Sequence, residues 1–236
     1  MDNPTGPSLN LTTKNFILLF VVTLGLILIA IIIFAWQTEI PRSQRWFSEP
    51  VLYVIQDYVY GGLMLICVYI FGIKIAKLTW REIGFVGCDK DWIIRAILLG
   101  TTIYALRIFS NGLSLVVLGT PRSAEPGVTD LAILREAPQY LDYMLIFAIA
   151  VLTPFATEIL QRGILFAWLR PNFNFLMAAV ASAIVFGVPH IQVTRYPQVL
   201  LFGVLAAYFY ERSRSLWPAI VFHMTINCAY LISTLG

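Results

Sequence analysis

Five polar side chains in the last third of the chain have types and spacings that could support peptide hydrolysis. Glu158 and Arg162 lie four residues apart. His223 and Asn227 have the same spacing, and His190 is the only other histidine. Residues four apart share one face of an α-helix, so each pair can act together. A glutamate and a histidine can take a proton from water, while a second histidine and an asparagine amide can donate hydrogen bonds to an oxyanion.

Two alternatives account for the same residues. His190, His223 and Glu158 could bind zinc, because two imidazoles and a carboxylate form the ligand shell of many zinc hydrolases. We rank zinc second and expect no cofactor, because the chain has no H-E-x-x-H motif and the ligands would come from separate helices. The polar groups could also be structural, since intramembrane charges pair with one another and Glu158 can pair with Arg162.

These residues lie in a very apolar chain. Of its 236 residues, 59% are hydrophobic and 12% are charged. The apolar residues form long runs, which are typical of membrane helices. The net charge of +3, without a basic cluster that contains aromatic residues, argues against a nucleic-acid partner. Cys67, Cys88 and Cys228 have neither a metal-binding spacing nor that of a disulfide framework.

The apolar runs predict an all-α fold, a polytopic membrane helix bundle of about seven transmembrane helices. The expected helices cover approximately residues 15–36, 51–76, 93–119, 141 onward, 173–191, 198–211 and 216–234. Between the second and third, Trp80 and Trp92 indicate an interfacial loop with a short helix. Lysine and arginine are more frequent beside helix ends on the side of the N-terminus, which predicts that the N-terminus is cytoplasmic.

The chain divides into three parts by composition. Residues 1–14 form a polar N-terminal tail, and residues 15–140 form N-terminal membrane helices and interfacial loops. Residues 141–236 form the core that carries the polar motifs. We expect an integral, multi-pass membrane protein that is surrounded by lipid.

The motifs of this core resemble those of the CPBP family, the CAAX-protease and bacteriocin-processing membrane proteins that are also called Abi or type II CAAX endopeptidases. That family carries E-E-x-x-x-R, F-x-x-x-H and H-x-x-x-N on successive helices. Here the second motif runs from Phe186 to His190, and the third runs from His223 to Asn227. The approach to the third motif, "YERSRSLWPAIVFHMTIN", is also similar to that of the family.

The first motif departs from the family at one position. Glu158 and Arg162 match the second glutamate and the arginine, but Thr157 stands where the family has its first glutamate, to which water activation is attributed. A threonine hydroxyl can hold water but cannot accept its proton near neutral pH. Adjacent helix positions point about 100° apart, so Glu158 could replace the missing base only if the helix is distorted, and Pro154 could distort it.

The resemblance implies a role for each motif residue. His190 would orient or activate water, and His223 and Asn227 would polarise the scissile carbonyl. Glu158 and Arg162 would support the helix, with Phe186 as a further supporting residue.

Three functions follow from these residues. The first is an intramembrane endopeptidase that activates water to hydrolyse peptide bonds of a membrane-associated protein or peptide. The second is a catalytically impaired pseudoprotease that binds membrane segments as a scaffold, immunity or regulatory protein. The third is a transporter or channel, for which Asp57 and Arg107 within helices would line a path. We favour the peptidase, although Thr157 predicts low activity.

Overall fold

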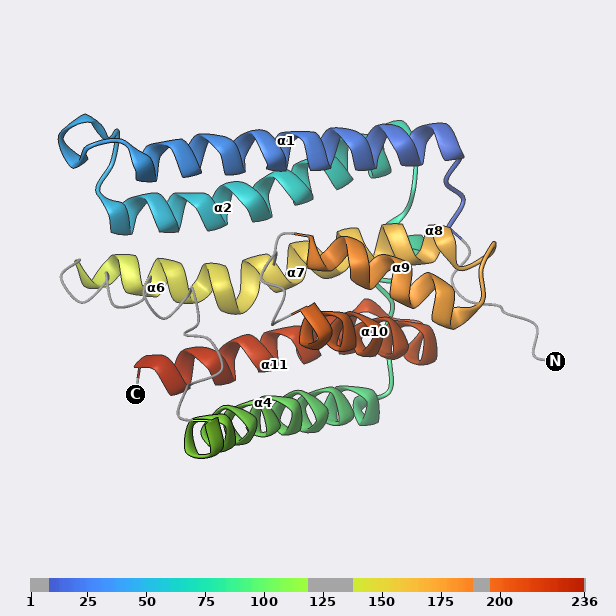
Figure 1. The fold of residues 1–236 in the computed structure, drawn as a ribbon. Helices are drawn as coiled ribbons and strands as arrows, with labels where there is room; N and C mark the ends of the chain where they lie inside the picture. The colour runs from blue at the N-terminus through green and yellow to red at the C-terminus, as the bar shows by residue number, and fades with distance from the viewer. Residues whose placement is uncertain (1–8, 119–137, 189–195, 236) are drawn as a thin grey trace.

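The computed structural model describes residues 9–118, 138–188 and 196–235. Every regular element in these ranges is helical, which confirms the predicted all-α membrane bundle (Figure 1). Within these described ranges, five helical stretches are long and apolar enough to cross a membrane: Thr13–Glu39, Glu49–Ile75, Lys90–Ser110, Gln139–Leu169 and Leu216–Ser233.

The first half of the chain supplies three long helices and a short one. Helix α1 covers Thr13–Glu39, and α2 covers Glu49–Cys67 and continues as the π-helical stretch η2, Val68–Ile75. A 3₁₀ turn, η1, covers Arg42–Gln44 between them. The short interfacial helix α3 is present at Trp80–Ile83, and α4 covers Lys90–Leu118.

The second half begins with one long rod that changes its helical register several times. The rod consists of α6 (Gln139–Phe147), π-helical η4 (Ala148–Leu152), α7 (Thr153–Glu158), π-helical η5 (Ile159–Phe166) and α8 (Ala167–Leu169). Then follow α9 (Phe175–Gly187), α10 (Tyr196–Ser213) and α11 (Leu216–Leu235). π-Helical turns within α-helices are frequent at functional sites.

Two of the expected spans are shorter than the others. Helix α9 has 13 residues and ends at Gly187, before the predicted end at residue 191. At about 1.5 Å per residue it is about 20 Å long, less than the ~30 Å hydrocarbon core of a bilayer. The short helices α9 and α10 pack against each other, and α10 also packs on α11.

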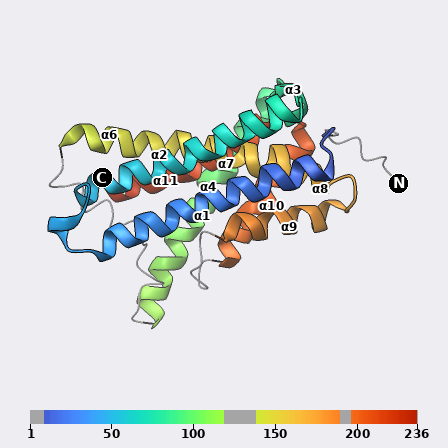
Figure 2. The same cartoon turned by 90° about the horizontal axis from the view of Figure 1, so that it is seen from above.

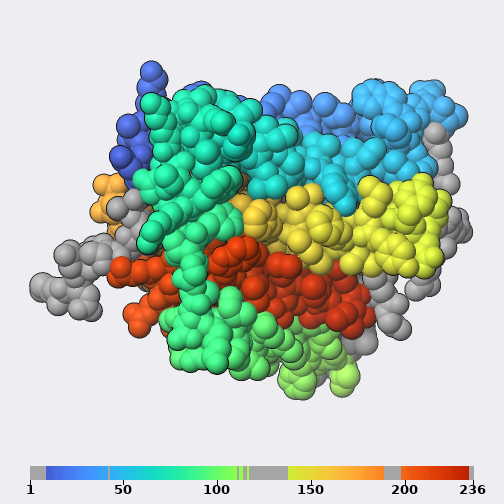
Figure 3. All heavy atoms as spheres, turned by 180° about the vertical axis from the view of Figure 1, so that it is seen from behind, coloured from blue at the N-terminus to red at the C-terminus, as the bar shows by residue number. Residues whose placement is uncertain are grey.

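The helices stack in a fixed order around the rod. Helix α1 packs on α2, α2 on α7, α7 on α11 and α11 on α4, and these layers follow one another in Figure 1. The view from behind shows the same order as successive bands on the surface (Figure 3). Seen from above, α4 crosses the direction of α1 and α2 (Figure 2). The rod is therefore the central layer, covered by α2 on one side and by α11 on the other.

The segment after α3 fastens the beginning of α11 to the end of α10. Gly84 has φ +109°, and a Cβ there would lie 2.5 Å from a ring carbon of Tyr210. The hydroxyl of Tyr210 donates to the carbonyl of Ile83 at 3.1 Å, and the amide of Leu216 donates to the carbonyl of Gly84 at 2.9 Å. A glycine is needed here because φ is positive and the tyrosine ring is close. These contacts fix the entry of the helix that carries His223.

Candidate active site

Glu158 and Arg162 form an ion pair in the middle of the rod. Both side chains have no exposed surface; Arg162 Nε lies 3.1 Å from Glu158 Oε2, and Nη1 donates to Oε1 at 3.3 Å. The pairing expected from their spacing is therefore present. Burying two charges together is tolerated because each compensates the other, but removing one partner typically costs about 3–5 kcal/mol.

Arg162 has a third contact that the sequence did not indicate. Its Nη2 donates to the backbone carbonyl of Gly203, in α10, at 2.9 Å. A Cβ on Gly203 would lie 2.5 Å from the Cβ of Ala183 in α9, so only glycine allows this approach of α10 to α9. The glycine therefore places its own carbonyl where the guanidinium needs an acceptor. A glycine in an apolar helix gives no sequence signal for such a role.

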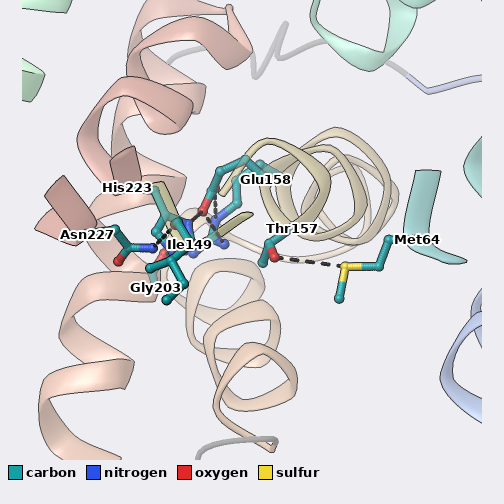
Figure 4. A network of polar contacts seen from close by, with 8 residues as sticks. Met64, Ile149, Thr157, Glu158, Gly203, His223 and Asn227 are labelled. Carbon is teal, nitrogen blue, oxygen red and sulfur yellow. Dashed lines mark hydrogen bonds and ion pairs between the residues drawn. The ribbon is translucent and has the colours of Figure 1, made fainter. Parts of the chain in front are cut away.

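His223 reaches Glu158 from the neighbouring helix α11. Its Nδ1 lies 2.8 Å from Glu158 Oε1, and the imidazole is buried (Figure 4). Its ring packs edge-on against Phe202 and Phe186, with centroid distances of 4.7 and 5.9 Å. The guanidinium carbon of Arg162 lies 5.2 Å from the centroid of Phe186. Phe186 therefore touches both the cation and the imidazole, whereas Phe202 was not expected from the sequence.

Asn227 lies one turn beyond His223 and is bonded to the backbone of the rod. Its Nδ2 donates to the carbonyl of Ile149, in η4, at 2.8 Å. The amide of Thr153 donates to Ala148, five residues earlier. In the same register the carbonyl of Ile149 would need the amide of residue 154, which is proline and has no N–H. Asn227 thus satisfies a carbonyl that Pro154 leaves without a backbone donor, and η4 is the distortion expected near this proline.

The side chain of Thr157 points away from the rod in a different direction from that of Glu158. Its hydroxyl points to the sulfur of Met64 in α2, at 3.9 Å, whereas Glu158 points to His223 (Figure 4). Thr157 is buried, with 7% of its surface exposed. Met64 therefore faces the position where the family has its first glutamate. A methionine in an apolar helix resembles a lipid-facing residue, so the sequence alone did not select it.

His190 lies outside the described residues. Its place in one site with His223 and Asn227, which the resemblance implies, therefore stays a prediction. Over the described ranges, no three His, Cys, Asp or Glu side chains are grouped to hold a metal ion. The zinc alternative needs His190 as a ligand, so it also stays a lower-ranked prediction.

The two charged residues considered for a transport path lie on separate sides of the site. Asp57 is in α2 and Arg107 is in α4, where its guanidinium carbon lies 5.8 Å from the ring centroid of Tyr104. Helices α2 and α4 lie on opposite sides of the central rod (Figure 1). A path lined by both residues would have to pass through that rod, so the fold does not favour this function.

The fold and the site together describe an integral membrane protein with a buried carboxylate, guanidinium and imidazole on adjoining helices. Residues 139–229 match the family model described as "Type II CAAX prenyl endopeptidase Rce1-like". A Bacillus subtilis (strain 168) protein named "Putative membrane peptidase YdiL" is 26% identical over 183 residues, which cover 68% of this chain and 73% of that protein. No solved structure matches the chain. Residues 139–229, which carry the motifs, are therefore similar to the type II CAAX prenyl endopeptidases, in agreement with the resemblance that the motifs indicated.

Proposed function

We propose that this protein is an intramembrane endopeptidase of the type II CAAX prenyl endopeptidase kind. It hydrolyses peptide bonds of membrane-associated proteins or peptides by water activation at the site formed by Glu158, His223 and Asn227, with His190 as a further member. The observation that carries the proposal is the contact of His223 with Glu158 at 2.8 Å, deep in the bundle and within the region that matches the family. The name of the Bacillus relative supports the same activity.

The proposed peptidase has low turnover because of residue 157. A general base contributes about 10²–10⁴-fold to such reactions, and the Thr157 hydroxyl cannot take this role. We expect Thr157→Glu to raise the rate of cleavage, because it restores a carboxylate at the family's position for water activation. The measurement is the initial rate on membrane-anchored peptides that carry a fluorophore and a quencher, with purified protein in liposomes. Thr225→Glu, on a different helix, controls for a nonspecific effect of the added charge.

A pseudoprotease is the second candidate, and the environment of Thr157 favours it. The hydroxyl contacts a thioether, and both oxygens of Glu158 are engaged by Arg162 or His223. A pseudoprotease would bind the peptides without cutting them, and only its Thr157→Glu variant would cleave them. Absence of both peptide binding and cleavage would contradict the peptidase and the pseudoprotease alike. Solute flux through the same liposomes would indicate a transporter. A chelator should leave cleavage unchanged, since we propose no metal.

We further propose that the N-terminus lies in the cytoplasm. The exposed basic residues Lys74, Lys77 and Arg81 surround the interfacial helix α3, and such residues accumulate on the cytoplasmic side of membranes. A single cysteine introduced into the N-terminal tail should be protected from an impermeant thiol reagent in intact cells. Labelling from outside would contradict this orientation.

A further inference from the structure

The contact between His223 and Glu158 determines which ring nitrogen of the histidine carries a proton. Nδ1 lies 2.8 Å from Oε1, a hydrogen-bond distance. An ionised carboxylate can only accept hydrogen bonds, so Nδ1 must be the donor. Glu158 is ionised because Arg162 pairs with both of its oxygens.

The charge of the cluster determines the state of the other nitrogen. Glu158 and Arg162 have no exposed surface, and together they carry no net charge. A neutral imidazole keeps the three side chains neutral, whereas an imidazolium would leave one uncompensated positive charge in the buried cluster. In the neutral ring with a proton on Nδ1, Nε2 carries a lone pair and cannot donate a hydrogen bond.

We infer that His223 is the proton acceptor among the described residues of this site, with Glu158 as the residue that positions it, and that His223 does not begin the reaction as a donor to the oxyanion. This inference rests on the proposed peptidase function. The other described candidates are excluded by their chemistry: Thr157 is not a base near neutral pH, and both oxygens of Glu158 are engaged. The imidazole keeps 9% of its side chain exposed, whereas Glu158 has none. The positioned histidine is thus also the more accessible partner.

The reaction is balanced without any additional reactant. The oxygen of water bonds to the carbonyl carbon while one proton of the water moves to Nε2 of His223. Glu158 stabilises the resulting imidazolium but does not take its proton, as in other carboxylate–histidine pairs. The proton then passes to the leaving nitrogen as the C–N bond breaks, which yields a carboxylic acid and an amine. Asn227 uses one amide N–H for Ile149, and the other is available for the oxyanion.

Nuclear magnetic resonance of the histidine rings tests the inference without any need for turnover. The chain has two histidines, so the protein with ¹⁵N-labelled imidazoles gives two ring systems, and His190→Phe assigns them. We expect His223 to have a protonated Nδ1 and an unprotonated Nε2 at neutral pH. A proton on Nε2 of the neutral ring would overturn the inference, whatever the rate of cleavage.

Cleavage by variants tests the role of the lone pair. His223→Gln should lower kcat by about 10²–10⁴-fold without a matching change in KM, because a proton acceptor is lost but peptide binding is kept. Glu158→Gln alone would leave Arg162 unpaired, so the informative variant is Glu158→Gln with Arg162→Met, which removes both charges. This double variant should lower kcat by about 10²-fold or more and should let the Nε2–H tautomer appear. If the double variant folds and keeps both the Nδ1–H tautomer of His223 and the wild-type kcat, the inference is overturned.

A second ion pair supplies the matched control. Glu211 pairs with Arg170 at 2.9 Å, and both side chains are 17% exposed. Glu211→Gln removes a carboxylate from an arginine without a histidine partner, so kcat and the tautomer of His223 should both be unchanged. If the wild-type protein shows the expected tautomer but cleaves no peptide, the peptidase function and the proton-accepting role both fail. The tautomer assignment alone would then stand.

Discussion

Helix α1 and the π-helical stretch η5 are both apolar in sequence but occupy opposite environments. In α1, large side chains such as Val21 and Leu28 are 63% and 57% exposed on the surface that lipid would cover. In η5, every residue from Ile159 to Phe166 is buried, including Arg162. One buried polar group of α1, the hydroxyl of Thr23, donates to the carbonyl of Leu19 in its own helix at 2.6 Å. Arg162 instead depends on partners from α7 and α10, so its stability is a property of the whole bundle.

The largest expected difference between the two regions comes from removing Glu158. Glu158→Ala leaves the Arg162 guanidinium buried without its carboxylate, which should destabilise the protein by about 3–5 kcal/mol and lower its yield. Unfolding of the purified protein in detergent measures the change. Leu28→Ala in α1 is the control, and it should change stability by less than about 0.5 kcal/mol. Equal stability of Glu158→Ala and the wild type would mean that the buried pair contributes nothing.

Replacing a glycine by alanine should have opposite effects on stability near the site and in α1. Gly203→Ala should cost about 1–3 kcal/mol, because its Cβ would meet Ala183 Cβ at 2.5 Å. Gly25→Ala in α1 meets nothing within 4 Å and should stabilise the helix by up to about 1 kcal/mol. Denaturant titration of both variants checks the opposite signs. A neutral Gly203→Ala would show that α9 and α10 are not held at this distance.

The bond between Asn227 and Ile149 predicts a coupling between two distant positions. Asn227→Leu leaves the Ile149 carbonyl without its donor and should cost about 1–3 kcal/mol. Pro154→Ala restores a backbone N–H that can take over, so the cost of Asn227→Leu should fall by about 1 kcal/mol in that background. A double-mutant cycle of unfolding free energies measures the coupling. Strict additivity would show that the proline does not create the need for the asparagine.

The smallest effect is expected at the membrane surface, in helix α3. Hydrogen bonds from the backbone N–H and hydroxyl of Thr79 lower the pKa of Glu82 from its ordinary value of 4.5. Because the pKa is lowered in the folded protein, this contribution is present above the ordinary value and is lost as pH falls through the folded value. Thr79→Ala should therefore cost about 1 kcal/mol at neutral pH and less in acid. A cost that does not depend on pH would contradict the role of the carboxylate.

The sequence predicted the features that follow from composition and from helical spacing. The membrane bundle, the short helix at Trp80 and the pairing of Glu158 with Arg162 were all expected, because they depend on apolar runs, on interfacial tryptophans and on a four-residue spacing. The roles of the motif residues, and the place of His190, stay predictions.

The remaining site contacts depend on backbone atoms and on register, which side-chain patterns do not reveal. Arg162 binds a carbonyl 41 residues away, and Asn227 binds one 78 residues away. Any residue type has a carbonyl, so Gly203 and Ile149 give no signal as acceptors. Nor does an apolar run distinguish an α-helical from a π-helical stretch, because both are equally hydrophobic.

The π-helical stretch η4 shifts the helical register of the rod just before the residues of the site. An α-helix turns by about 100° per residue, so a shift of one residue decides which neighbour faces α11. With the shift in η4, Glu158 meets His223 and Thr157 meets Met64. A regular α-helix over the same residues would rotate both side chains by about one residue position, roughly 100°, about the axis of the rod. The identity of the residue offered to His223 is therefore determined by the length of the helix before it as much as by its own sequence.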